Sequence, residues 1–203
     1  MTRWTFCFLL AVGLAACTAP AMQDPIFFRL DSAAEIPDVR AAQASQAILE
    51  VEPFQATGIT GDRAMLYSAD GGATLHQRHY ASWAEAPARM IRDQFIAELD
   101  AAHLFSKTVP SEMRADAAYR LRGTLRQLVQ LTDSSGKQGK GTLLILDITV
   151  QHNPDDRIVW SGTLRKEVAP KGPGIEDAAE ALRTAVKETV ADLIRMLAAQ
   201  PLA

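Results

Sequence analysis

Cysteine, aromatic residues and charge of one sign are all scarce in this chain. Of its 203 residues only two are cysteines and 6% are aromatic, and the formal net charge is −3 at pH 7. A balance this close to neutral, and on the acidic side, argues against a nucleic-acid partner, which needs a basic stripe. It also argues against broad electrostatic attraction to anionic lipid. Any attachment to a membrane must therefore come from another feature.

That feature lies at the N-terminus, where both cysteines stand. Arg3 precedes an apolar run from Trp4 to Val12, and Leu14-Ala15-Ala16-Cys17 follows. The run is shorter than the ~20 residues that span a bilayer, and the order of charge, apolar run and small residues before a cysteine is that of a secretory signal closed by a lipobox. The alternative is a buried first helix or strand of a cytosolic domain. We expect residues 1–16 to be a lipoprotein signal peptide.

Cleavage before Cys17 would make that residue an acylated N-terminus. Several acyl chains form a stable anchor, at ~0.8 kcal/mol per buried methylene. By resemblance to bacterial lipoproteins generally, Thr18 in the next position points to the outer membrane, because no acidic residue stands there to suggest retention at the inner one. Residues 17–24 are then a lipidated tether, and the 187 remaining residues contain no cysteine pair that could form a disulfide.

Strands are predicted from alternating apolar and polar residues and from the turns between them. The alternation is clearest from Tyr119 to Leu131. Asp70-Gly71-Gly72 predicts a hairpin, because glycine adopts φ > 0 at little cost. The predicted strands are Ile26–Leu30, Ala47–Phe54, Arg63–Ala69, Ala73–Tyr80, Leu104–Val109, Tyr119–Leu131, Thr142–His152 and Arg157–Val168, the last with Ile158, Trp160 and Leu164 on one face.

Two helices are predicted from apolar stripes at helical spacing. The first spans Pro87–Ala102, with the proline in the first helical position, where its missing N–H is harmless. The second spans Ile175–Ala199. Short turns between neighbouring strands favour antiparallel pairing, so the expected fold class is α+β, mainly an antiparallel sheet with two amphipathic helices packed on one face. We expect residues 25–203 to form a single periplasmic domain.

The sequence carries no catalytic or metal-binding signature. His76 and His79 stand three apart on a predicted strand, so they point to opposite faces and cannot share one ion. Gly136–Thr142 lacks the leading glycine and the final Ser or Thr of a phosphate loop, and it joins two strands. The Asp155-Asp156 pair is explained by its turn. We therefore expect no enzyme activity, no cofactor and no metal.

Two groups of residues are candidate partner contacts. Arg120, Arg122 and Arg126 fall on the polar face of a long predicted strand, and Tyr80 and Trp83 lie at a strand–helix junction. Aromatic and arginine side chains are common binding anchors. Each group also has a plainer interpretation, which is a solvated sheet face for the arginines and core packing for the aromatics.

The chain resembles the ABC-type transport auxiliary lipoproteins, a family that includes the paraquat-inducible intermembrane transport lipoprotein. The resemblance covers nearly the whole mature chain. Ala86 departs from it, because the family often has a second proline there, and this departure leaves the helix start intact. It is carried by the lipobox Leu14–Cys17, the strand Ile26–Leu30, the segment Leu49–Phe54, the hairpin through Tyr67, the segment Tyr80–Pro87 that opens a helix, and Tyr119-Arg120-Leu121.

The resemblance implies a non-enzymatic accessory anchored through Cys17. It would work with an ABC permease, its ATPase and a mammalian-cell-entry-domain periplasmic protein to move lipids or hydrophobic solutes between membranes. Accessory subunits often form rings, so a homo-oligomer is among the expected partners. Because folds are reused, two other hypotheses stay open: a lipoprotein chaperone or assembly factor for another envelope complex, and a periplasmic hydrolase.

Overall fold

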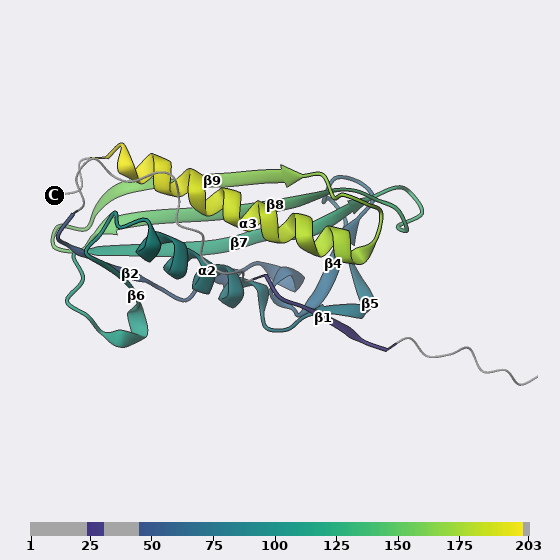
Figure 1. Ribbon diagram of the computed structural model, residues 1–203, viewed down its shortest axis with the longest axis horizontal. Helices are drawn as coiled ribbons and strands as arrows, with labels where there is room; N and C mark the ends of the chain where they lie inside the picture. The colour runs from purple at the N-terminus through teal and green to yellow at the C-terminus, as the bar shows by residue number, and fades with distance from the viewer. Residues whose placement is uncertain (1–23, 31–44, 201–203) are drawn as a thin grey trace, which may run out of the picture.

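The computed structural model describes residues 24–30 and 45–200 (Figure 1). Cys17, the predicted signal peptide and most of the predicted tether lie outside the described residues. Within the described part of the chain, no helix is long and apolar enough to cross a bilayer. The elements are β1 (Ile26–Phe28), β2 (Ile48–Val51), β3 (Gln55–Ala56), the 3₁₀ turn η1 (Gly58–Gly61), β4 (Ala64–Ser68), β5 (His76–Trp83), α2 (Pro87–Ala101), β6 (Lys107–Pro110), the 3₁₀ turn η2 (Ser111–Met113), β7 (Tyr119–Thr132), β8 (Gly139–His152), β9 (Arg157–Val168) and α3 (Ile175–Ala198).

Three long strands form an antiparallel meander. β7 pairs with β8 from Tyr119 opposite His152 to Thr132 opposite Gly139, and β8 pairs with β9 along nearly all of its length. These strands follow the alternation in the sequence, and short turns join them, which is the connection that antiparallel neighbours allow. The three predicted long strands are confirmed here.

The other side of β7 carries short strands that run in the same direction as β7. β2, β3 and β4 pair with it one after another, all in parallel. Five of the eight strand pairs in the sheet are parallel. The prediction of a mainly antiparallel sheet is therefore wrong, and the sheet is mixed. The reason is connectivity, because β5, α2 and β6 lie between the short strands and β7, and such long crossovers return the chain in the same direction.

Both helices cover one face of the sheet (Figure 1). α2 contacts β6 and β7, α3 contacts β8 and β9, and the helices contact each other. Pro87 is at the start of α2, as predicted. One hydrophobic core joins the helices to the sheet, and it includes Phe95 of α2, Val190 of α3 and Leu146 of β8.

The last strand departs from the predicted alternation. Its pairing with β8 shifts between Val150 and Gln151, and such a bulge changes which residues share a face. Ile158 is 62% exposed, whereas Trp160 and Leu164 belong to the core or pack against it. The prediction that these three side chains share one face is wrong for Ile158.

Candidate functional site

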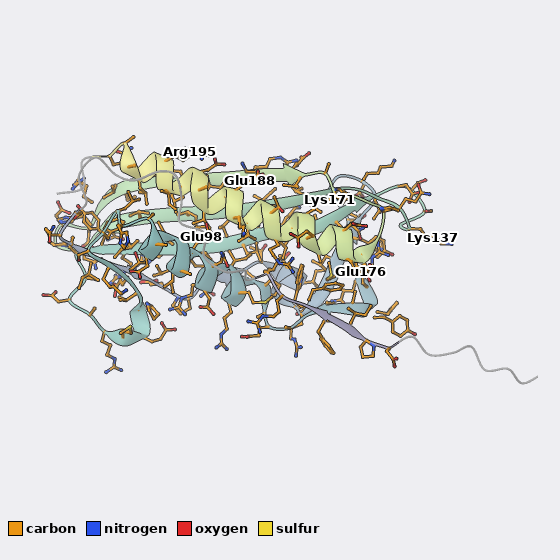
Figure 2. All side chains as sticks on the ribbon, in the orientation of Figure 1. Glu98, Lys137, Lys171, Glu176, Glu188 and Arg195 are labelled. Atoms are coloured by element: carbon orange, nitrogen blue, oxygen red, sulfur yellow. The ribbon has the colours of Figure 1, made fainter. Side chains whose placement is uncertain are left out.

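A cleft of about 430 Å³ is lined by residues of β1, β5 and the start of α3. Residues 77–81 of β5 form one wall, and residues 173–175 at the start of α3 form another. The lining is completed by Ile26 of β1, Tyr67 of β4, Gln130 of β7 and Lys137 of the β7–β8 turn. Figure 2 shows Lys137 at the tip of that turn, at the same end of the molecule as the start of α3. This volume falls in the range of sites for small ligands.

Arg78 is the central side chain of the cleft. Its Nη2 donates hydrogen bonds to Oε1 of Gln130 and to the carbonyl oxygen of Gly136, both at 2.9 Å. Its guanidinium carbon lies 4.2 Å from the centroid of the Tyr67 ring, which is a cation–π contact. The ring of His76 stacks on the same tyrosine at 5.1 Å. These contacts hold the guanidinium in one orientation.

Among the described residues, no carboxylate forms an ion pair with Arg78 in the cleft. The lining contains no Asp or Glu, and the buried Nε has no hydrogen-bond partner among the described residues. Burial lowers the pKa of the Arg78 guanidinium from its ordinary value, and Tyr67 partly opposes this effect. Arginine remains protonated in proteins all the same. The cleft therefore holds a partly buried positive charge that no acidic side chain of residues 24–30 and 45–200 neutralises.

Two exposed large hydrophobic side chains belong to the lining of this cleft. Ile26 is 43% exposed and Tyr80 is 45% exposed, and both line the cleft. Tyr80 is one of the two aromatic residues predicted as partner contacts. The other, Trp83, is only 1% exposed and packs in the core, so it presents no surface in this structure.

The predicted arginine contacts lie elsewhere, on the sheet, and acids neutralise them. Arg120 pairs with Glu50 at 2.6 Å and with Glu52 at 3.1 Å, and Arg122 pairs with Glu52 at 3.0 Å. Arg126 pairs with Asp147 at 3.1 Å. These pairs give the strand a mixed-charge surface instead of a basic patch. A role of this surface in partner contact stays a prediction.

Sequence reasoning missed Arg78 as a site residue. It stands between His76 and His79 in the sequence, and no sequence pattern marks its neighbours in space. Within residues 24–30 and 45–200, no three His, Cys, Asp or Glu side chains are placed to hold a metal ion. The chemistry that the cleft offers is recognition of an anion next to an apolar surface.

A comparison with known protein families identifies the family of this chain. A family described as the ABC-type transport auxiliary lipoprotein component matches residues 28–194. The chain belongs to this family. The predicted resemblance is confirmed, and with it the role of an auxiliary component of an ABC transport system. Membership also implies a membrane-anchored place in the cell envelope.

Solved structures share the fold at low sequence identity. A protein from Xanthomonas campestris superposes with a TM-score of 0.68 at 17% identity, covering 84% of this chain and 90% of that one. An uncharacterized protein gives 0.66 at 12% identity, covering 86% and 99%. A PelC dodecamer from Paraburkholderia phytofirmans gives 0.47 at 12% identity over 78% and 94%. No curated protein matches the sequence significantly.

Proposed function

We propose that this protein is a non-enzymatic auxiliary lipoprotein, anchored in the outer membrane, of a system that moves lipids or hydrophobic solutes across the cell envelope. The observation that carries the proposal is the family match over residues 28–194 in a chain with a lipobox cysteine at position 17. Its partners in this proposal are a mammalian-cell-entry-domain periplasmic protein and the ABC permease and ATPase of the same system. Copies of the chain can also associate with one another.

The tether sets how far the body stands from the membrane. Asp24, the first described residue, follows Cys17 by seven positions. An extended chain spans at most ~3.6 Å per residue, so Asp24 lies within about 25 Å of an acylated Cys17. β1 follows at once and lies at the end of the molecule that holds the cleft (Figure 1). The proposal therefore places this end toward the membrane and leaves the opposite end for periplasmic partners.

The anchor is tested by comparing Cys17→Ala with Cys7→Ala in the full chain. We expect Cys17→Ala to abolish acylation and to weaken the envelope or its tolerance of toxic solutes. Cys7→Ala should change neither, because that cysteine leaves with the signal peptide. Mass spectrometry of the purified protein and density-gradient separation of the two membranes measure the outcome. Wild-type protein that is unacylated at Cys17, or that sediments with the inner membrane, would contradict the proposed anchoring in the outer membrane.

The partner is tested by crosslinking wild-type protein in intact cells and identifying what is captured. We expect a mammalian-cell-entry-domain protein together with the permease, and crosslinks between copies if the protein self-associates. Failure to capture any such protein from membranes would refute the proposed mammalian-cell-entry partner and the lipid-transport role that depends on it. Capture of the subunits of a different envelope machine would favour the assembly-factor alternative instead.

A further inference from the structure

Arg78 differs from the other arginines of the sheet in what surrounds it. Arg120, Arg122 and Arg126 each face a carboxylate within 3.1 Å. In the described part of the chain Arg78 forms no ion pair, and its hydrogen bonds use Nη2 alone. A buried polar group without a partner, here Nε, is rare in native structures and calls for a ligand or an ordered water. Nη1 remains available to such a ligand.

The lining favours an anion that is attached to an apolar group. Lys137 adds a second cation to the cleft, and the start of α3 borders it through Gly174. The Gly174 N–H already donates to the carboxylate of Asp177 at 3.3 Å, so the arginine and the lysine must supply the recognition. Phosphate oxygens accept strong charge-assisted hydrogen bonds from both kinds of side chain. Beside them, the exposed Ile26 and Tyr80 offer apolar contact.

The position of the cleft selects the source of that anion. Ile26 follows Cys17 by nine residues, so it lies within about 32 Å of the acylated end. We propose that the Arg78 cleft binds the phosphate of a phospholipid headgroup in the anchoring membrane, with Ile26 and Tyr80 against the glycerol and the upper acyl chains. Of the proposed function, this inference depends only on the acylated anchor at Cys17 and not on the transport partners. Binding would orient the body with its β1 end on the bilayer.

The test uses the full acylated protein in a neutral, phosphate-free detergent, with native mass spectrometry as the readout. Three probes are added in turn: dioleoylphosphatidylglycerol, dioleoylglycerol with the same tails and no phosphate, and inorganic phosphate. We expect an adduct with phosphatidylglycerol that is at least tenfold more abundant than the adduct with either of the other two. This result would show that binding requires the phosphate and the acyl chains in the same ligand.

The variants are Arg78→Gln and the matched control Arg122→Gln, an arginine on the same sheet that is outside the cleft. We expect Arg78→Gln to reduce the phosphatidylglycerol adduct about tenfold and Arg122→Gln to leave it within about twofold, because only the first removes a donor from the cleft. Arg78→Lys keeps the charge and should retain part of the binding. Circular dichroism of each variant confirms that the fold is intact.

Four outcomes would overturn the inference. Equal adducts with phosphatidylglycerol and dioleoylglycerol would leave only apolar binding, and an equal adduct with inorganic phosphate would make the site one for free anions. Equal loss in Arg78→Gln and Arg122→Gln would show a nonspecific charge effect. If Arg78→Gln bound lipid normally but lost its crosslink to a partner protein, the cleft would belong to a protein interface. If the wild-type protein bound phosphatidylglycerol but captured no transport subunit, the proposed function would be refuted, and phospholipid binding by the Arg78 cleft would still be supported.

Discussion

Gly123 in β7 provides a direct test of how tightly the core is packed beneath α2. A Cβ added to this glycine would lie 2.7 Å from three carbon atoms of the Phe54 ring. The ring is 7% exposed and makes an edge-to-face contact with Phe95, with centroids 5.3 Å apart. Because both rings belong to the core, a shift of the Phe54 ring would disturb its contact with Phe95. Gly123→Ala should therefore strain the core.

The expected magnitude comes from measured effects of overpacking. Inserting a methyl group into a packed core destabilises a protein by about 1–3 kcal/mol. Alanine itself favours the folded state over glycine by roughly 0.5–1 kcal/mol in a strand, so the two effects oppose each other. We expect Gly123→Ala to lower the free energy of unfolding by about 1–2 kcal/mol. Urea unfolding followed by circular dichroism measures it.

Gly141→Ala is the matched control, because it lies in β8 of the same sheet. A Cβ at this position meets only Leu131, at 3.6 Å, which is ordinary contact. We expect this variant to be neutral or more stable by about 0.5 kcal/mol. Adding Phe54→Leu to Gly123→Ala should give less than the sum of the two single effects, because the smaller side chain relieves the clash. If Gly123→Ala and Gly141→Ala had the same stability, the packing described here would be wrong.

Two further predictions concern polar groups. Arg92 is 8% exposed and donates to the Val51 carbonyl at 3.0 Å, so Arg92→Met should lower the free energy of unfolding by about 1–3 kcal/mol. As the control, substitution of the exposed Arg89 by methionine should change it by less than about 0.5 kcal/mol. Equal urea midpoints for the two variants would contradict this prediction. Hydrogen bonds, chiefly from the Thr74 N–H, lower the pKa of Asp70 from 3.8 to about 2. A lowered folded-state pKa stabilises the fold above the unfolded value, and this stabilisation is lost as the pH falls from about 4 to about 2. The melting temperature of wild type should therefore fall more steeply across that window than that of Asp70→Asn, and parallel curves would refute the assignment.

The sequence predicts those parts of the fold that depend on residues close together in the chain. The meander from Tyr119 to Val168 combines alternation with turns of a few residues, so its strand pairs are local. The Pro87 start of α2 is also a local signal. The direction of β2, β3 and β4 against β7 is not local, because the partners are separated by tens of residues and by a helix. The bulge that turns Ile158 outward is equally hidden, since one extra residue reverses the alternation that follows it.

The candidate site shows why sequence patterns alone do not reveal such a cleft. Arg78 stands in a run of polar residues and Arg120 in an alternating strand, and neither pattern shows which arginine has an acid beside it. The parallel pairing of β2 with β7 puts Glu50 opposite Arg120, and a shift by one residue would put an apolar side chain there instead. Arg78 reaches across β4 to Gln130, and none of the strands around it presents an acid to the cleft. Strand register, which the sequence does not state, thus decides which arginine is neutralised and which is left for a ligand.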